Sequence, residues 1–373
     1  MMAKKSGGLA DVIAGQTAIS TVGKEGIGLT YRGFSIEDLA AHAVFEETAY
    51  LLIYGRLPNQ LELHAYITKL QKLRKLPASL LIILEQLPSS SHPMDVLRTG
   101  VSALGALEPE NEERDQYAVS DRLLACCTSI LLYWHHFHTK GVRLDTESEH
   151  ESIAGHFLQL LHGSRPSDLH LQALDASFTL YAEHEFNAST FAARVTASTL
   201  SDAYSAVTTA IGTLRGNLHG GANEAAMALI EAFPNPTKAE AGIVQLLQEK
   251  KLIMGFGHRV YSIKDPRSDM IKSWSKRLSD ETQDWVLYDV SERIEQLMRK
   301  EKQLFPNLDF YSASVYRLLG IPTSLFTPIF VLARMSGWMA HLIEQRSSNR
   351  LIRPNAAYIG PEPAVWRAIE ERA

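Results

Sequence analysis

Two histidines in glycine-rich segments are the first side chains of this sequence that could do chemistry. His219 lies in LHGGANEAAM and His258 lies in MGFGHRVY, so each stands beside backbone that a ligand can approach closely. A histidine in a glycine turn is also common as an ordinary hydrogen-bonding loop residue. Gly255 and Gly257 lack the third glycine and the preceding strand of a dinucleotide-binding fingerprint, so that kind of site is only weakly supported.

An aspartate with apolar neighbours is the candidate for a general base. Asp309 lies in FPNLDFYS, where Leu308, Phe310 and Tyr311 could exclude water from it. Loss of water would raise the pKa of the carboxyl toward a value useful for proton transfer. The alternative is that Asp309 is only the N-cap of the helix that follows.

Three arginines could bind carboxylates. Arg267 follows an Asp-Pro pair that predicts a helix start, and a cation in the first turn opposes the helix dipole. We therefore expect an anionic ligand beside Arg267. Arg334 is the only formally charged residue within 325–343, so its burial requires an anion from the core or from a substrate. Arg353 is the third candidate, with a surface position as the alternative.

A fourth group is His184 in YAEHEFNAST, which could join such a site or form a surface pair with Glu185. Together, these side chains suit a reaction between a carbon acid and a dicarboxylate. The aspartate would remove a proton next to a carbonyl, and one histidine would hydrogen-bond the developing enolate oxygen. Another histidine would donate a proton to a second carbonyl, and the arginines would bind carboxylates through paired hydrogen bonds.

The composition indicates a soluble helical protein that must position these groups. The chain has 373 residues, of which 45% are hydrophobic, enough for a large core and more than one domain. A net charge of −5 gives no basic excess for nucleic acid. Cys126 and Cys127 are adjacent and match neither a disulfide nor a zinc spacing, and the N-terminus has no apolar run typical of a signal peptide. We expect a reducing, cytoplasmic location.

The longest apolar stretch, 324–343, approaches the length of a membrane span. It contains Pro328, Arg334 and His341, however, and it is a single stretch. We therefore expect a buried core helix and no membrane association.

Helical periodicity continues through most of the chain, and the predicted fold class is all-α. Ser35 and Asp38 predict the start of a helix that continues to residue 55, and further helices are expected at 61–73 and 78–87. Residues 105–120 and 139–150 are expected to be exposed connections.

A change in residue composition and charge along the chain predicts two domains. The stretch 191–214 is rich in small residues, which suits either tight internal packing or a subunit interface. From about 221 the helices become more charged, with glycine and proline between them. We expect a small helical domain at 221–323, inserted into a large helical domain formed by 1–220 and 324–373.

The motifs LHGGANEA, GFGHRVY, DPR, FPNLDFYSASVY and ARMSGWMAH occur in the order typical of one family. Over nearly its whole length the chain resembles the citrate synthase family. The resemblance implies a two-domain all-α fold with the active site in the cleft between the domains.

The resemblance also implies a role for each candidate. His219 would stabilise the enol of an acyl-CoA, Asp309 would take its α-proton, and His258 would bind and protonate the carbonyl of oxaloacetate. The residues implied to hold oxaloacetate are His184, Arg267, Arg334 and Arg353, the last reaching the neighbouring site of a homodimer. The backbone implied to bind coenzyme A is that of Leu252, Ile253, Met254, Gly255 and Phe256. Hydrolysis then releases CoA without a metal, redox group or permanently bound cofactor.

Two further segments, KSGGLADVIAGQTAIS and SHPMDVLRTGVSALG, resemble the 2-methylcitrate synthase branch, which condenses propionyl-CoA with oxaloacetate. Tyr181 and Leu308 could shape a pocket for the additional methyl group, with side activity on acetyl-CoA. The alternatives are an ordinary citrate synthase and an inactive helical regulatory paralogue. Ser262 stands where some citrate synthases carry a basic residue, which leaves the contacts to the CoA phosphates open.

Overall fold

Helices are the main elements of the computed structural model, which describes residues 9, 12–24, 28–261 and 263–372. The all-α prediction is confirmed, with one small antiparallel sheet of order β1-β2-β3 that the sequence had not indicated. The elements are β1 (Ser20–Lys24), β2 (Gly28–Tyr31), β3 (Phe34–Ser35), α1 (Ile36–His42), α2 (Phe45–Tyr54), α3 (Gln60–Lys72), α4 (Ala78–Gln86), α5 (Pro93–Leu107), α6 (Gln116–Lys140), α7 (Ile153–His162), α8 (Asp168–Tyr181), α9 (Ala188–Ser198), α10 (Ala203–Leu214), α11 (Ala222–Glu231), α12 (Pro236–Gln248), α13 (Pro266–Thr282), α14 (Val286–Lys302), α15 (Leu308–Leu318) and α16 (Phe326–Ser347), with short 3-10 turns at Thr323–Leu325 and Ile369–Glu371.

The helix predicted to run from Ser35 to residue 55 starts as expected but is interrupted. The Ser35 side chain accepts a hydrogen bond from the Asp38 backbone N–H, as an N-cap does. The backbone then becomes extended at 43–44, and a second helix begins at Phe45. The N–H of Phe45 donates to the carboxylate of Asp175 on α8, 3.1 Å away. This tertiary contact fixes the second helix start, and local sequence does not reveal it.

Other boundaries also differ from the predictions. The stretch 191–214 is divided between α9 and α10, because Asp202 caps a new helix by accepting from the N–H of Ser205. The connection predicted at 105–120 is shorter, since α5 extends to Leu107 and α6 begins at Gln116. The helices predicted at 61–73 and 78–87 are present as α3 and α4.

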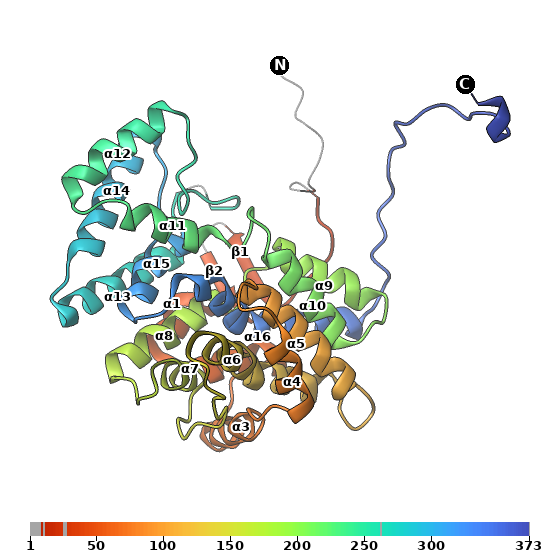
Figure 1. The fold of residues 1–373 in the computed structure, drawn as a ribbon, viewed down its shortest axis with the longest axis horizontal. Helices are drawn as coiled ribbons and strands as arrows, with labels where there is room; N and C mark the ends of the chain where they lie inside the picture. The colour runs from red at the N-terminus through yellow and green to blue at the C-terminus, as the bar shows by residue number, and fades with distance from the viewer. Residues whose placement is uncertain (1–8, 10–11, 25–27, 262, 373) are drawn as a thin grey trace.

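Helix α16 is the centre of the core (Figure 1) and contacts α2, α6, α8 and α9. It is long and apolar enough to cross a membrane, but its most apolar stretch is completely buried inside the protein. The prediction of a buried core helix for this segment is confirmed.

Helices α11 to α15 pack mainly against one another and form the group at the left of Figure 1. Within this group α12 packs on α14, and α13 packs on α15. The group meets the other helices where α13 contacts α1 and α8, where α15 contacts α8, and where α11 contacts α16. These contacts bring the segments that carry the predicted site residues together.

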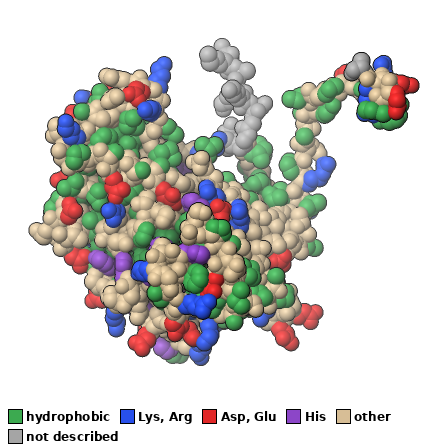
Figure 2. Space-filling view, viewed as in Figure 1, with side chains coloured by type: hydrophobic (Ala, Val, Ile, Leu, Met, Phe, Trp, Pro, Cys, Tyr) green, Lys and Arg blue, Asp and Glu red, His purple; other side chains and the backbone are tan. Residues whose placement is uncertain are grey.

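The C-terminal segment after α16 extends away from the body of the molecule (Figure 1). Hydrophobic side chains remain visible along it in the space-filling view (Figure 2). Its most exposed large apolar residues are Tyr358, Ile359, Val365, Trp366 and Ile369.

Candidate active site

The loop before His258 is bound to the start of α15. The backbone N–H of Asn307 donates to the carbonyl of Gly255 over 2.9 Å, and the Asn307 side chain donates to the carbonyl of Gly257 over 3.1 Å. A Cβ at Gly255 would lie 2.9 Å from the Cβ of Phe310, and its φ of +84° also favours glycine. The glycines therefore allow the loop to pack closely enough to bring His258 beside α15.

Hydrogen bonds assign the proton of the His258 ring. Its Nδ1 accepts from the backbone N–H groups of Val260, at 3.0 Å, and Tyr261, at 3.3 Å. Because these groups can only donate, Nδ1 carries no proton. Burial, and secondarily the charge of Arg267, lowers the pKa of His258 to about 4. At neutral pH the ring is uncharged and its Nε2–H is available as a donor.

His184 lies against His258, so the alternative of a surface pair with Glu185 is wrong. The centroids of the two imidazole rings are 5.0 Å apart, and Nε2 of His184 is 3.1 Å from the hydroxyl oxygen of Tyr261. Burial, followed by the charge of Arg267, holds the pKa of His184 well below its usual value. His184 is therefore a neutral, buried member of the group.

His219 is oriented by Ser189, a residue that the sequence analysis did not identify. The backbone N–H of Ser189 donates to Nε2 of His219 over 3.3 Å, and the Ser189 hydroxyl lies 2.9 Å from the same nitrogen. The ring proton is therefore on Nδ1. Burial, and then the charge of Arg334, lowers the pKa of His219 to about 4. Asn187, the N-cap of α9, was the available signal, because it places Ser189 in the first turn.

Asp309 is not the N-cap of α15. That position belongs to Asn307, whose side chain accepts from the N–H of Asp309 over 3.1 Å. The Asp309 carboxylate instead accepts a 2.6 Å hydrogen bond from the hydroxyl of Tyr181. Burial raises the pKa of Asp309, although the Tyr181 hydrogen bond and the charge of Arg267 oppose this. The predicted upward shift of the Asp309 pKa is confirmed.

The anion beside Arg267 is Asp265, so the charge of Arg267 in the first helical turn does not by itself require a ligand. Their side chains form two hydrogen bonds of 2.9 and 2.8 Å, and both are buried. Burial alone would raise the pKa of Asp265, but the charge and hydrogen bonds of Arg267 lower it. The two-residue spacing allows this pairing inside the first helical turn.

Arg334 is buried without a carboxylate partner within 4 Å among the described residues. Its Nε donates to the backbone carbonyl of Tyr181 over 2.7 Å, and its guanidinium lies 4.7 Å from the ring centroid of Phe330. Burial, opposed by the charge of Glu183, lowers the pKa of Arg334 to about 10. The guanidinium remains charged at neutral pH and can bind an incoming anion.

The fold agrees with the comparisons to known proteins. The family described as "Citrate synthase, C-terminal domain" matches residues 8–355. The chain belongs to the citrate synthase family. It is 55% identical over 356 residues to a 2-methylcitrate synthase of Shewanella oneidensis, which covers 95% of each chain. It is 43% identical to a citrate/2-methylcitrate synthase of Bacillus subtilis, with coverage of 95% of this chain and 96% of the relative.

A solved structure from the citrate synthase family shows the same fold. The ternary complex of carboxymethyl coenzyme A and oxaloacetate with citrate synthase from Thermoplasma acidophilum superposes with a TM-score of 0.89 at 34% identity. The match covers 97% of this chain and 98% of that chain. The citrate synthase fold is therefore established for nearly the whole chain.

Two further predicted features are Arg353 and the segment 252–256. Arg353 is exposed in the C-terminal segment, where its guanidinium donates to Asn355. In the segment predicted to bind coenzyme A, Leu252 is exposed and Ile253 is buried. Ser262 lies outside the described residues.

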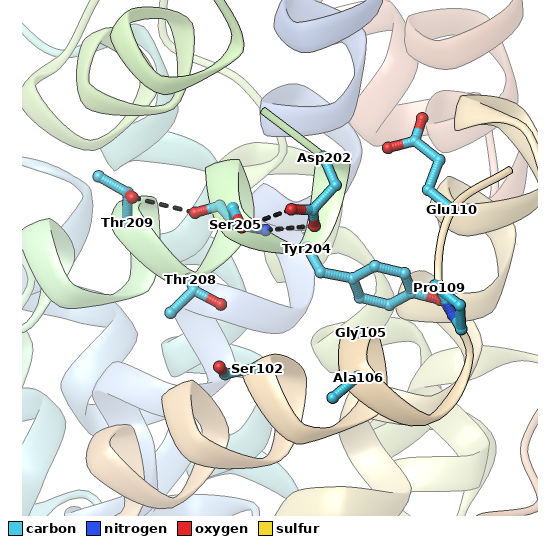
Figure 3. Close-up of a pocket in the computed structure, with 10 residues that line it drawn as sticks. All are labelled: Ser102, Gly105, Ala106, Pro109, Glu110, Asp202, Tyr204, Ser205, Thr208 and Thr209. Atoms are coloured by element: carbon cyan, nitrogen blue, oxygen red, sulfur yellow. Dashed lines mark hydrogen bonds between the residues drawn. The ribbon is translucent and has the colours of Figure 1, made fainter. Parts of the chain in front are cut away.

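The hollow shown in Figure 3 is separate from these groups. It has a volume of about 590 Å³ and lies between α5 and α10, and none of the predicted site residues lines it. Within the described ranges, no three His, Cys, Asp or Glu side chains are grouped closely enough to hold a metal ion.

Proposed function

We propose that the protein condenses propionyl-CoA with oxaloacetate and water, and releases 2-methylcitrate and CoA. The observation that carries this proposal is the 55% identity to a 2-methylcitrate synthase across 95% of both chains. Two further relatives named 2-methylcitrate synthase, from Corynebacterium glutamicum and Mycobacterium tuberculosis, are 40% and 41% identical.

The first step is removal of the α-proton of the thioester by Asp309. Its carboxylate is partly buried, and its raised pKa makes it a stronger base than an exposed aspartate. As the enolate forms, negative charge develops on the thioester oxygen. The Nδ1–H of His219 is the donor for this oxygen, because Nε2 already accepts from Ser189.

The second step joins the α-carbon to the keto carbon of oxaloacetate. The keto oxygen becomes an alkoxide and takes a proton from Nε2 of His258, the ring nitrogen that carries hydrogen in the neutral tautomer. Water then hydrolyses the thioester of the condensed product, so that the C–S bond breaks and CoA leaves as the thiol. Arg267, Arg334 and His184 hold the carboxylates of oxaloacetate during these steps.

The two predicted domains divide this machinery. His258, Arg267 and Asp309 belong to the segment 221–323, whereas His219 and Arg334 belong to the remainder. We propose that 221–323 moves as a unit and closes over the substrates. The packing of α11 to α15 mainly against one another supports this division.

A homodimer is also part of the proposal, with Arg353 completing the neighbouring site. The exposure of Arg353 and the apolar side chains along the extended C-terminal segment support contact with a second copy.

We also propose a cytoplasmic location, consistent with Cys126 and Cys127, which are both free and buried. The backbone of residues 252–256 would bind coenzyme A.

The second candidate is an ordinary citrate synthase that uses acetyl-CoA. A relative named citrate synthase 2, from Bacillus subtilis, is 44% identical over 98% of this chain. One methyl group in an apolar pocket changes the free energy of activation by only about 1–3 kcal/mol. Because this difference is small, we expect acetyl-CoA to be a slower substrate and not an excluded one.

Thiol titration of released CoA, with oxaloacetate and either thioester, tests the proposal. A higher kcat/KM for propionyl-CoA is expected. A higher value for acetyl-CoA would favour the ordinary citrate synthase. Release from neither, nor from thioesters of other lengths, would favour the inactive paralogue.

A further inference from the structure

The hydroxyl of Tyr181 meets the carboxylate of Asp309 across the contact between α8 and α15. Tyr181 is the last residue of α8, is only 1% exposed, and donates to Oδ1 of Asp309 over 2.6 Å. Burial, and then the charge of Asp309, raises the pKa of Tyr181 well above its usual value, so the phenol keeps its proton. A hydrogen bond from a neutral donor to a carboxylate stabilises the charged form.

The position of Tyr181 is itself fixed from two sides. Its backbone carbonyl accepts from Nε of Arg334 over 2.7 Å, and its ring packs edge-to-face on Phe330 with centroids 4.6 Å apart. The phenol cannot turn away from Asp309 without disturbing this packing. Tyr181 therefore connects the candidate base to the arginine that is available for oxaloacetate.

The other charged groups that influence Asp309 are occupied elsewhere. Arg267 and Asp265, on and before α13, bond to each other, and the one described hydrogen bond of Arg334 on α16 goes to the Tyr181 carbonyl. Within the described residues, Tyr181 is the only donor to the carboxylate of Asp309, and Oδ2 accepts no hydrogen bond. Oδ1 of Asp309 is thus held by the Tyr181 hydroxyl, and Oδ2 remains available to accept a proton.

We propose that Tyr181 is a positioning residue for the base: its hydroxyl holds Oδ1 of Asp309, favours the ionised carboxylate and directs Oδ2 toward the α-proton. The proposal rests on the proposed function, because it assumes that Asp309 removes that proton. It extends the expectation from the sequence, which gave Tyr181 a role only in shaping the pocket for a methyl group.

The variant Tyr181→Phe removes the hydroxyl and keeps both the ring and the backbone carbonyl. With 13C-labelled aspartate, we expect the carboxyl resonance of Asp309 to titrate about one pH unit higher than in the wild type. The resonance is assigned by its loss in Asp309→Asn. The acid limb of kcat/KM for propionyl-CoA should move in the same direction, and the affinity for oxaloacetate should remain unchanged.

The matched control is Tyr316→Phe. Tyr316 lies on α15, is fully buried, and hydrogen-bonds Ser177 on α8 over 2.7 Å. It therefore loses a phenol hydroxyl from the same helix contact without losing a bond to Asp309. An unchanged Asp309 titration in Tyr181→Phe, or an equal shift in both variants, would overturn the proposal.

The two proposals can fail separately. The carboxyl titration is measured on the unliganded protein and does not depend on turnover. A wild-type protein that releases no CoA would contradict the proposed reaction, whereas an active protein with an unshifted titration would contradict only the role of Tyr181.

Discussion

The backbone N–H of Ser189 lies 3.3 Å from Nε2 of His219 and determines which ring nitrogen of that histidine carries the proton. Because Nε2 is an acceptor, Nδ1 is the donor that can face a developing oxyanion. The first turn of α9 therefore fixes the tautomer of His219 that the proposed enolate stabilisation requires.

Removal of this donor should affect the chemical step. We expect His219→Ala to lower kcat by about 10²- to 10³-fold, the usual cost of losing one oxyanion donor, while oxaloacetate affinity remains unchanged. Ser189→Ala is the control, because it keeps the backbone N–H and should lower kcat by less than about tenfold. Steady-state kinetics and calorimetric titration with oxaloacetate measure both effects. Equal losses in the two variants would contradict this assignment of the proton.

The buried histidines should make stability depend on pH. The pKa values of His219 and His258 are about 4 in the folded protein and 6.5 in the unfolded reference. Between these values the unfolded chain binds more protons, so the free energy of unfolding decreases as the pH falls from 6.5 toward 4. Above pH 6.5 these groups contribute no pH dependence.

Thermal denaturation across this range checks the expectation. His258→Gln should show a smaller decrease of Tm between pH 6.5 and 4 than the wild type. His64→Gln, which changes an exposed residue of α3, should follow the wild-type curve. An identical pH dependence for all three proteins would show that His258 is not held neutral by its surroundings.

The two site arginines should respond differently to the same substitution. Arg267→Met leaves Asp265 as a buried unpaired charge, and we expect a loss of about 3–5 kcal/mol of stability. Arg334→Met leaves no carboxylate without a partner, so it should lower the free energy of unfolding by less. The affinity for oxaloacetate should fall by about 10- to 100-fold. Denaturant unfolding and calorimetric titration separate these effects. Normal oxaloacetate affinity in Arg334→Met would mean that Arg334 has a structural role.

The shared-site hypothesis for Arg353 can be tested by mixing inactive subunits. Arg353→Ala and Asp309→Asn are each expected to have little activity alone. A mixed dimer contains one site with both residues intact, so activity should return when the two variants are refolded together. Activity that stays at the level of the separate variants would show that Arg353 acts within its own subunit or not at all.

Helical periodicity was sufficient to predict the all-α fold. The candidates His219, His258 and Asp309 could be named because glycine-framed histidines and an apolar-flanked aspartate are local patterns. The hydrogen bonds that hold Asp309 and His219 are not local, whereas those that set the tautomer of His258 come from Val260 and Tyr261. Tyr181 and Asp309 are separated by 128 positions, and Ser189 and His219 by 30.

Two expectations missed a hydrogen-bond partner, which is distant in the sequence in one case and two residues away in the other. The continuous helix after Ser35 is interrupted because Asp175 accepts from the N–H of Phe45, a contact across 130 positions. The anion that offsets the charge of Arg267 in the first helical turn is Asp265, which both caps the helix and pairs with the guanidinium. Helix propensity and charge pattern cannot decide between such partners before the chain is folded.

The central claim is that Asp309 removes the α-proton of the acyl-CoA. The most direct test follows deuterium exchange at the α-carbon of propionyl-CoA in heavy water, with oxaloacetate bound, in the wild type and in Asp309→Asn. We predict exchange or turnover with the wild type, and neither with the variant, although the variant still binds oxaloacetate. Exchange that continues unchanged in Asp309→Asn would contradict the assignment of Asp309 as the base.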